Sequence, residues 1–339
     1  MHAWQLTSHG SPEKVLQLRQ LPDPAPQVGE VLIRSEGFGL NYADVMAVKG
    51  LYRDAPPPPC VLGYEVVGRV DQCGDGVPAD LLGKRVLAFT RFGGYAQRPC
   101  TDHRAVAVIA DGMDLGPALA MATQGATAWY MAMVAAPVQK GDRVLIHSAA
   151  GGVGQLLVQI ALHQGSEVFA VAHGAEKMAY LKELDAQHVI DRKAGDYAAA
   201  VRERLGKERL DFSFNAVGGT TFKKDLALLG PGGKLVLYGG AERGNGGAFG
   251  TLRFVWNMGF VIPIFLMMRS RSLMGVNMLR LSESRPLLVA ACMQGALGAW
   301  GEGWLKPKVH PLFNQDQLPQ AMELLGSGKS IGKVAVCWG

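Results

Sequence analysis

The spacing of apolar residues divides the chain into two parts near Leu115. Before this point, short apolar runs interrupted by glycine and proline predict a β-rich barrel or meander with few helices. The predicted strands are Val31 to Arg34, Gly63 to Asp71, Arg85 to Phe89 and Ala105 to Ile109. One short helix is expected over Tyr42 to Lys49, because Gly50 supplies a natural C-terminal stop.

After Leu115 the pattern predicts two helical stretches to about Ala135 and then strands that alternate with helices, which is typical of a parallel sheet covered on both faces. The strands are expected at Arg143 to His147, Glu167 to Ala172, His188 to Ile190, Asp211 to Asn215, Lys234 to Tyr238 and Ser272 to Val276. The helices are expected at Gly152 to His163, Glu176 to Leu184, Ala194 to Leu205 and Thr220 to Leu229. Beyond Leu281 a helix, a strand at Lys308 to Phe313, another helix and a strand at Lys333 to Cys337 are expected to return to the first part.

The composition is that of a soluble globular protein, with 48% hydrophobic and 19% charged residues. The net charge of +5 comes without a run of Lys and Arg, so no nucleic-acid partner is expected. Five cysteines without a CxxC pair argue against a disulfide framework and against a cysteine-rich zinc lobe. Because free thiols suit a reducing compartment and Met1 to Gly10 lack the pattern of a signal peptide, we expect a cytoplasmic location.

The apolar stretch from Phe254 to Met268 is shorter than the roughly 18–20 residues that a membrane-spanning helix needs, and it contains Pro263. A buried element, a wall of the substrate pocket and a subunit interface all fit this pattern. A peripheral membrane contact also fits, because Trp256 and the flanking Arg253 and Arg269 are typical of a membrane interface.

A glycine-rich turn joins the strand at Arg143 to the helix that follows it. Backbone N–H groups and the dipole at the start of a helix favour a pyrophosphate there, and glycines allow the backbone to approach the phosphates. The residues expected to hold the diphosphate are Ala150, Gly151, Gly152, Val153 and Gly154. The first glycine of the usual G-x-G-x-x-G pattern is Ala149 here, so the strand and helix around the turn carry much of the prediction.

NADPH rather than NADH is predicted from the end of the second strand of this series. A site for NAD usually has Asp or Glu about 20 residues beyond the glycines, to bind the ribose 2′-hydroxyl. Here the strand ends at Ala172 and His173, with no acid in this position. Lys177, with Arg192 or His173, is expected to pair with the 2′-phosphate, although a solvated lysine on a helix is an alternative for Lys177.

Four segments resemble the zinc-independent quinone oxidoreductases of the medium-chain dehydrogenase/reductase superfamily. They are Gly39 to Tyr52, Leu62 to Gly68, Ala149 to Gly154 and Ser330 to Lys333. Within that family, the Asn-Tyr-Ala-Asp segment and the apolar region around Trp256 are most similar to the branch of the vesicle amine transport protein homologues.

The resemblance implies an α/β fold in which a Rossmann domain, a doubly wound parallel sheet, interrupts a β-rich GroES-like catalytic domain. The expected division is residues 1–122 for the first part of the catalytic domain and 123–265 for the NADPH-binding domain. Residues 266–339 would supply the sixth Rossmann strand and the return to the catalytic domain.

The resemblance also implies that no zinc is bound. Zinc-dependent relatives carry Cys at the position of Asn41 and His at the position of Tyr64, and an amide and a phenol are poor replacements for these ligands. Without zinc, a substrate carbonyl must be polarised by hydrogen bonds, which favours activated acceptors such as quinones and enones.

The expected catalytic residues are Asn41, Tyr52 and Tyr64. Asn41 would hold the nicotinamide ribose or a substrate oxygen, and Tyr52 would donate a hydrogen bond to a developing oxyanion. A turn-capping asparagine and a packed tyrosine are the alternatives. Further residues expected to contact the cofactor are Thr127, Tyr238, Gly239 and Lys333, with a core role as the alternative for Thr127.

Two functions follow from these observations. The first is an NADPH-dependent, zinc-free reductase of quinones or α,β-unsaturated carbonyls. The second is an NADPH-binding protein that associates with a membrane or partner and has little turnover. A homodimer is expected, with the strand at Ser272 to Val276 as a candidate edge for pairing.

Overall fold

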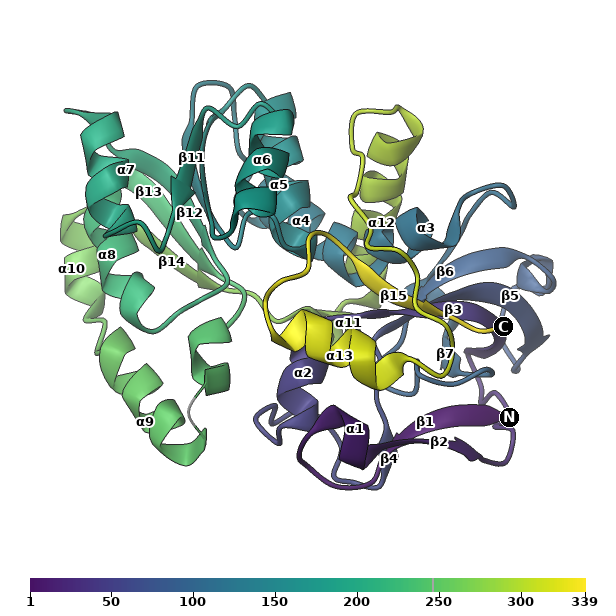
Figure 1. Ribbon diagram of the computed structural model, residues 1–339. Helices are drawn as coiled ribbons and strands as arrows, with labels where there is room; N and C mark the ends of the chain where they lie inside the picture. Colours follow the sequence, from purple (N-terminus) through teal and green to yellow (C-terminus); the bar gives the residue numbers. More distant parts are fainter. Residues whose placement is uncertain (246) are drawn as a thin grey trace. The chain divides into compact units, whose positions relative to one another are not determined.

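The computed structural model describes residues 1–245 and 247–339 and contains two compact units (Figure 1). The first unit combines residues 1–127 with residues 278–339, and the second consists of residues 128–277. The chain thus leaves the first unit once and returns to it.

The first unit is built on antiparallel sheets. Its larger sheet has the strand order β15-β3-β5-β6-β8, and β7 also pairs with β3. These strands are β3 (Glu30–Leu40), β5 (Glu65–Cys73), β6 (Arg85–Phe89), β7 (Cys100–Asp102), β8 (Val106–Val108) and β15 (Val334–Cys337). A smaller sheet, in the order β2-β1-β4, contains β1 (His2–Leu6), β2 (Leu16–Gln20) and β4 (Cys60–Val61). Strand β15 lies beside β3, so the end of the chain completes a sheet begun by its first forty residues.

Helices close the edges of this unit and cover its core. They are α1 (Pro12–Val15), α2 (Tyr42–Val48), α3 (Leu115–Ala120), α11 (Met278–Ser284), α12 (Pro286–Gly301) and α13 (Leu318–Gly326). A π-helical segment, Met121–Gly125, follows α3, and α4 (Ala126–Trp129) and a second π-helical segment, Tyr130–Ala135, lead into the second unit. Alternate residues of β3 and β5 fill the core, and the ring of Phe38 in β3 lies 4.7 Å from that of Tyr95.

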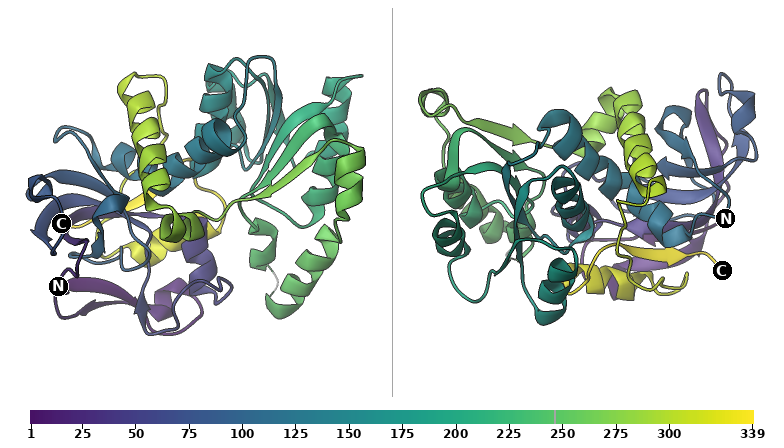
Figure 2. Two further views of the ribbon diagram at one scale, coloured as in Figure 1. Left: turned by 180° about the vertical axis from the view of Figure 1, so that it is seen from behind. Right: turned by 90° about the horizontal axis from the view of Figure 1, so that it is seen from above.

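The second unit is a six-stranded parallel sheet in the order β11-β10-β9-β12-β13-β14. Its strands are β9 (Arg143–His147), β10 (Glu167–Ala172), β11 (His188–Asp191), β12 (Leu210–Asn215), β13 (Leu229–Leu237) and β14 (Ser272–Gly275). In chain order this is 3-2-1-4-5-6, the order of doubly wound dinucleotide-binding sheets. Figure 2 shows the same sheet from two further sides.

Helices lie on both faces of this sheet (Figure 1). They are α5 (Gly152–His163) and α6 (Ala175–Glu183) on one face, and α7 (Tyr197–Leu205) and α8 (Thr220–Leu228) on the other. The structure confirms the predicted fold class, because an antiparallel β unit is combined with a doubly wound parallel sheet.

One predicted strand is not formed. Lys308 to Phe313 is not a strand: Val309 and Phe313 form only isolated bridges to Lys333 and Val336. Pro307 and Pro311 lack the N–H groups that a ladder requires, which explains the interruption.

The apolar stretch after β13 forms two helices, α9 (Gly247–Met258) and α10 (Pro263–Met268), separated by a turn. Neither of these, nor any other helix in the described ranges, has the length and apolarity to cross a bilayer.

Candidate functional site

The turn between β9 and α5 has the backbone geometry of an anion-binding loop. Ser148 adopts a positive φ of 52°, and its carbonyl accepts a hydrogen bond from the N–H of Gly151 at 2.8 Å. Gly151 precedes the helix and makes no side-chain cap bond to the first N–H groups of α5. A ligand oxygen placed at this helix start would meet several backbone donors and the positive end of the helix dipole.

Gly154 allows helix α5 to pack directly on this turn. A Cβ atom at Gly154 would lie 2.2 Å from the carbonyl oxygen of Ser148, a distance that real side chains do not tolerate. The glycine at this position is therefore required by the close approach of helix and strand end, as the glycine-rich pattern predicts.

An acid from the neighbouring strand β11 lies beside the end of β10, where the linear sequence did not place one. His173 Nδ1 lies 3.0 Å from Asp191 Oδ1, because the register pairs Ala172 with Asp191 of the neighbouring strand. The backbone N–H of Lys193 and the His173 ring lower the pKa of Asp191. The end of β10 itself has no acid, as expected, but the neighbouring strand supplies a carboxylate that is already bonded to His173.

Basic groups gather next to this acid. Lys177, on the first turn of α6, lies close enough to Arg192 for the two positive charges to interact. Burial, and secondarily the charge of Arg192, lower the pKa of Lys177. An anion bound between or beside two such cations offsets their mutual repulsion and so lowers their electrostatic free energy.

The carboxyl end of β13 carries the remaining candidates of this unit. The N–H of Tyr238 donates to the carbonyl of Asn215 at 3.1 Å, and burial raises the pKa of the Tyr238 phenol. A Cβ atom at Gly239 would lie 2.6 Å from the Ala216 carbonyl oxygen, so a close backbone approach requires glycine there.

In the first unit, Asn41 lies at the junction between a strand and a helix. It follows β3 and begins α2, and its backbone N–H donates to Asp44 Oδ2 at 2.8 Å. Its side-chain Nδ2 donates to Glu65 Oε1 at 2.9 Å, and its Oδ1 accepts from Gln124 Nε2 at 3.2 Å. The amide is thus oriented by two side chains and keeps one Nδ2 hydrogen that no described residue accepts.

Glu65 is paired with Lys333 in the interior of this unit. Both side chains are 0% exposed, and Lys333 Nζ contacts Glu65 Oε1 and donates to the Leu40 carbonyl at 3.1 Å. Glu65 Oε2 also accepts from the backbone N–H of Thr123 at 2.7 Å. Lys333 therefore acts on the site through Glu65, which in turn fixes the Asn41 amide.

Tyr52 and Tyr64 face each other beside this network. Their rings meet edge to face with centroids 6.3 Å apart, and burial raises the pKa of both phenols. Both hydroxyls consequently stay protonated and can donate. Thr127, by contrast, uses its hydroxyl to bond the Thr123 carbonyl at 2.5 Å.

Several buried polar atoms around Asn41 have no hydrogen-bond partner within the described residues. They are Asp44 Oδ1, Tyr64 Oη, Thr123 Oγ1 and Gln124 Oε1. Buried polar atoms are normally satisfied, so such a concentration indicates places for water or for a ligand's polar groups. Burial also raises the pKa of Asp44 to about 7, against the opposing effect of the Asn41 N–H.

A second buried network, which the sequence did not reveal, holds the strand ends of the parallel sheet. Asp225 is fully buried and accepts from His147 Nε2 (3.0 Å), Tyr197 Oη (2.7 Å), Ser213 Oγ (2.7 Å) and Asn215 Nδ2 (2.6 Å). Burial opposes ionisation, but His147 and the hydroxyl donors lower the pKa of Asp225 overall. No short motif connects these residues, because they come from the strands β9 and β12 and the helices α7 and α8.

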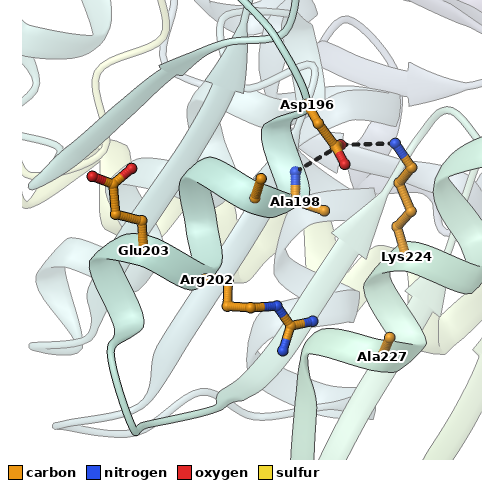
Figure 3. Close-up of a pocket in the computed structure, with 7 residues that line it drawn as sticks. Asp196, Ala198, Arg202, Glu203, Lys224 and Ala227 are labelled. Atoms are coloured by element: carbon orange, nitrogen blue, oxygen red, sulfur yellow. Dashed lines mark hydrogen bonds and ion pairs between the residues drawn. The ribbon is translucent and has the colours of Figure 1, made fainter.

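A hollow of about 490 Å³ lies on the surface between α7 and α8 (Figure 3). Lys224 and Asp196 form an ion pair of 2.7 Å across it, and Arg202 and Glu203 lie along the α7 side. It contains none of the residues expected at the site. In the part of the chain that the structure describes, no cluster of three or more His, Cys, Asp or Glu side chains is arranged to hold a metal ion.

Comparisons with known proteins agree with this architecture. Residues 27–139 match the alcohol dehydrogenase GroES-like domain, and residues 152–292 match a family described as zinc-binding dehydrogenase. The human synaptic vesicle membrane protein VAT-1 homolog-like is 32% identical over 98% of this chain and 80% of its own length. The chain belongs to the quinone oxidoreductase family of medium-chain dehydrogenase/reductases, in the branch with the VAT-1 homologues.

Two solved structures are similar to this chain over nearly all of its length. A mycobacterial protein complexed with NADPH has a TM-score of 0.87 at 30% identity and covers 99% of this chain and 100% of its own. The quinone oxidoreductase of Thermus thermophilus, also solved with NADPH, has a TM-score of 0.79 at 30% identity with the same coverage. The resemblance drawn from the four sequence segments is thereby confirmed.

Proposed function

We propose that the protein is an NADPH-dependent, zinc-free reductase that transfers a hydride to a quinone or an α,β-unsaturated carbonyl compound. The observation that carries this proposal is the uncapped, glycine-rich start of α5 together with the basic group of His173, Lys177 and Arg192. The relatives solved with NADPH support the choice of cofactor. When bound, NADPH supplies the hydride, and the protein binds, orients and donates protons.

The residues of the second unit fit the two phosphate groups of this cofactor. Backbone N–H groups of Gly152, Val153 and Gly154 would hold the diphosphate, with Ala150 and Gly151 shaping the turn. Lys177, Arg192 and His173 would hold the 2′-phosphate by charge-assisted hydrogen bonds. Tyr238 and Gly239, at the carboxyl end of β13, would line the nicotinamide side of the site, as in open parallel sheets generally.

The residues of the first unit fit the substrate side. Tyr52 and Tyr64 keep their protons and would donate hydrogen bonds to the oxygen on which negative charge develops. Asn41 would present its remaining Nδ2 hydrogen to the ribose or to a substrate oxygen, in an orientation that Glu65 and Gln124 fix. Lys333 would position the Asn41 amide through Glu65. Thr127 would support the backbone at Thr123, whose carbonyl accepts from its hydroxyl.

Assembly and location complete the proposal. Strand β14 is the edge of the parallel sheet, with exposed residues at Ser272 and Gly275, and this edge would pair with the same strand of a second copy in a homodimer. The substrate is a small molecule, and the location is the cytoplasm, where free thiols remain reduced.

The cofactor part of the proposal is tested by titrating the purified protein with NADPH and NADH and following fluorescence. NADPH should bind at least about tenfold more tightly, since charge-assisted bonds to the extra phosphate contribute roughly 1.5–3 kcal/mol. Tighter binding of NADH, or no binding of either, would contradict the assignment.

The substrate part is tested by following NADPH oxidation with a panel of quinones and enones. Tyr64→Phe and Tyr52→Phe should lower kcat by about a hundredfold for whichever donor serves the oxyanion. Tyr42→Phe, which removes a phenol from the same region outside the pair, is the matched control and should keep its kcat. If none of the acceptors supports NADPH oxidation although NADPH binds tightly, the reductase activity is contradicted while the cofactor site stands.

A further inference from the structure

The buried carboxylate of Asp225 connects the carboxyl ends of two adjacent strands, β9 and β12. It accepts from His147 Nε2 at 3.0 and 3.1 Å and from Asn215 Nδ2 at 2.6 Å. His147 is the last residue of β9 and directly precedes the glycine-rich turn, which begins at Ser148. Asn215 is the last residue of β12. One residue of α8 is thus bonded to both strand ends, at the edge where open parallel sheets bind their ligands.

The side chain of Asn215 shapes the turn that follows β12. Its Oδ1 accepts from the backbone N–H groups of Val217 and Gly218 at 2.8 and 2.9 Å. Its Nδ2 donates to Asp225 and, at 2.9 Å, to Thr221 Oγ1. A reversed amide would turn Nδ2 toward two N–H donors and Oδ1 toward a carboxylate, so these contacts fix one orientation. Through this amide, the position of Asp225 determines the position of the backbone in the turn.

The turn after β12 supports the segment that follows the neighbouring strand β13 (Figure 1). Three consecutive carbonyls of the turn accept hydrogen bonds from this segment. The pairs are Tyr238 N–H to Asn215 (3.1 Å), Ala241 N–H to Ala216 (3.1 Å) and Glu242 N–H to Val217 (3.2 Å). Tyr238 and Gly239 are the residues proposed above to line the nicotinamide side of the site. A displaced Asn215 amide would therefore move the backbone that is proposed to contact the nicotinamide.

A buried carboxylate at this place is not explained by stability alone. The removal of a carboxylate from water carries a large desolvation cost, and apolar side chains of similar volume often stabilise a core equally well or better. A carboxylate does, however, accept several hydrogen bonds in fixed directions. Tyr197 Oη and Ser213 Oγ donate to Asp225 in addition to His147 and Asn215, so four side chains hold it in place. This arrangement is suited to fixing the positions of the two strand ends.

We propose that Asp225 and Asn215 are positioning residues that hold the nicotinamide side of the cofactor site in place relative to the glycine-rich turn. This inference rests on the proposed function and deepens it. Asp225 acts through Asn215 on the backbone at Tyr238 and Gly239, and through His147 on the start of the glycine-rich turn. Asp225 and Asn215 are both 0% exposed, so they act through these contacts and not by touching the cofactor.

Calorimetric titration of the full chain with two ligands tests this proposal. One ligand is NADPH, and the other is adenosine 2′,5′-bisphosphate, which carries the 2′-phosphate but no nicotinamide. Asn215→Ala removes the bonds to the turn and to Asp225 together. The Kd for NADPH should rise about tenfold and that for the bisphosphate less than about twofold, because only NADPH reaches the displaced backbone. With an acceptor that supports turnover, kcat should also fall about tenfold, since the nicotinamide is misplaced.

The matched control is Tyr197→Phe, which removes another donor from the same carboxylate. The Tyr197 hydroxyl donates to Asp225 and to the Thr221 carbonyl, both in α8. This variant should lower the Tm but keep both dissociation constants within about twofold of those of the wild type. Asn215→Ser is a second, milder variant, because a serine hydroxyl can still accept from the N–H groups of the turn. It should show the same preference for weakening NADPH, to a smaller extent.

Thermal unfolding of each variant identifies the folded proteins that are compared. If the folded Asn215 variants weaken both ligands equally, or leave both unchanged, the positioning role is overturned while the assignment of NADPH stands. An equal selective loss in Tyr197→Phe also overturns it, because the effect then does not pass through the turn. Failure of the wild-type protein to bind NADPH contradicts the proposed function itself, and the positioning role falls with it.

Discussion

His173 Nδ1 and Asp191 Oδ1 lie 3.0 Å apart at the carboxyl ends of two adjacent parallel strands. This pair places an ionised carboxylate next to the group of cations proposed to bind the 2′-phosphate. We therefore expect the acid to limit the affinity for NADPH, while its bond to His173 holds the imidazole in place.

Asp191→Asn should strengthen NADPH binding. Removal of one negative charge close to the phosphate is expected to lower the Kd for NADPH about fivefold at low salt and to change the Kd for NADH much less. Asp196→Asn is a suitable control, because Asp196 also has a lowered pKa but lies at the hollow between α7 and α8. Titrations of both variants with both cofactors measure the effect, and an equal change for NADPH and NADH would contradict it.

Lys177→Met and Arg192→Met should each weaken NADPH binding by about tenfold or more. Each substitution removes one charge-assisted bond to the 2′-phosphate and leaves the contacts of the diphosphate unchanged. NADH binding should change little, so the ratio of the two dissociation constants is the informative quantity. Lys182→Met, in the last turn of the same helix, should leave the ratio unaltered.

Gly154→Ala should destabilise the protein and impair cofactor binding, because the added methyl group would collide with the Ser148 carbonyl oxygen. We expect a loss of about 1–3 kcal/mol in the free energy of unfolding, measured with urea, as for overpacked sites. The same substitution at Gly298, within α12, meets no atom within 4 Å. Gly298→Ala should therefore stabilise the protein by about 0.5–1 kcal/mol through helix propensity.

Asp44 should make stability depend on pH in the direction opposite to a salt-bridged carboxylate. Burial raises the pKa of Asp44 to about 7, against opposing effects of the Asn41 N–H and the Tyr95 hydroxyl; the charge of Glu65 raises it slightly further and that of Lys333 lowers it. The folded protein thus holds a proton that the unfolded chain releases near pH 4. The contribution of Asp44 to the free energy of unfolding is therefore present at low pH and is lost as the pH rises to about 7.

The measurement is urea unfolding of the wild type and Asp44→Asn at about pH 4.5 and pH 8. From pH 4.5 to pH 8, the free energy of unfolding of the variant should rise by about 3 kcal/mol relative to that of the wild type. The reason is that the amide imitates the protonated acid and does not ionise. Asp196→Asn should show the reverse trend, because the Lys224 side chain lowers the pKa of Asp196. If the difference in unfolding free energy between the wild type and Asp44→Asn does not vary with pH, Asp44 does not titrate in this range.

Much of the parallel sheet could be predicted from local patterns in the sequence. Strands β9 and β10 and helix α5 have the predicted bounds, because each combines a run of the correct period with a clear stop at glycine or a polar turn. The glycine-rich turn was predictable for the same reason, since strand, turn and helix are consecutive in the chain.

Relationships between distant residues were not predictable in this way. Asp191 meets His173 only because β11 pairs in register with β10, and the Asp225 network joins residues from four elements. The Lys333–Glu65 pair depends on the return of the chain to its first unit. The Lys308 to Phe313 segment had the apolar content of a strand, but the prolines at 307 and 311 limit it to isolated bridges.

The return of the chain has a consequence for synthesis on the ribosome. Lys333 bonds the carbonyl of Leu40, which is 293 positions earlier. At roughly 5–20 residues per second, about 15–60 s separate the synthesis of these two residues. During that interval Glu65 lacks its buried counter-ion and β3 has an unpaired edge. The uninterrupted parallel-sheet unit can fold in the meantime, so the first unit to emerge is the last to be completed.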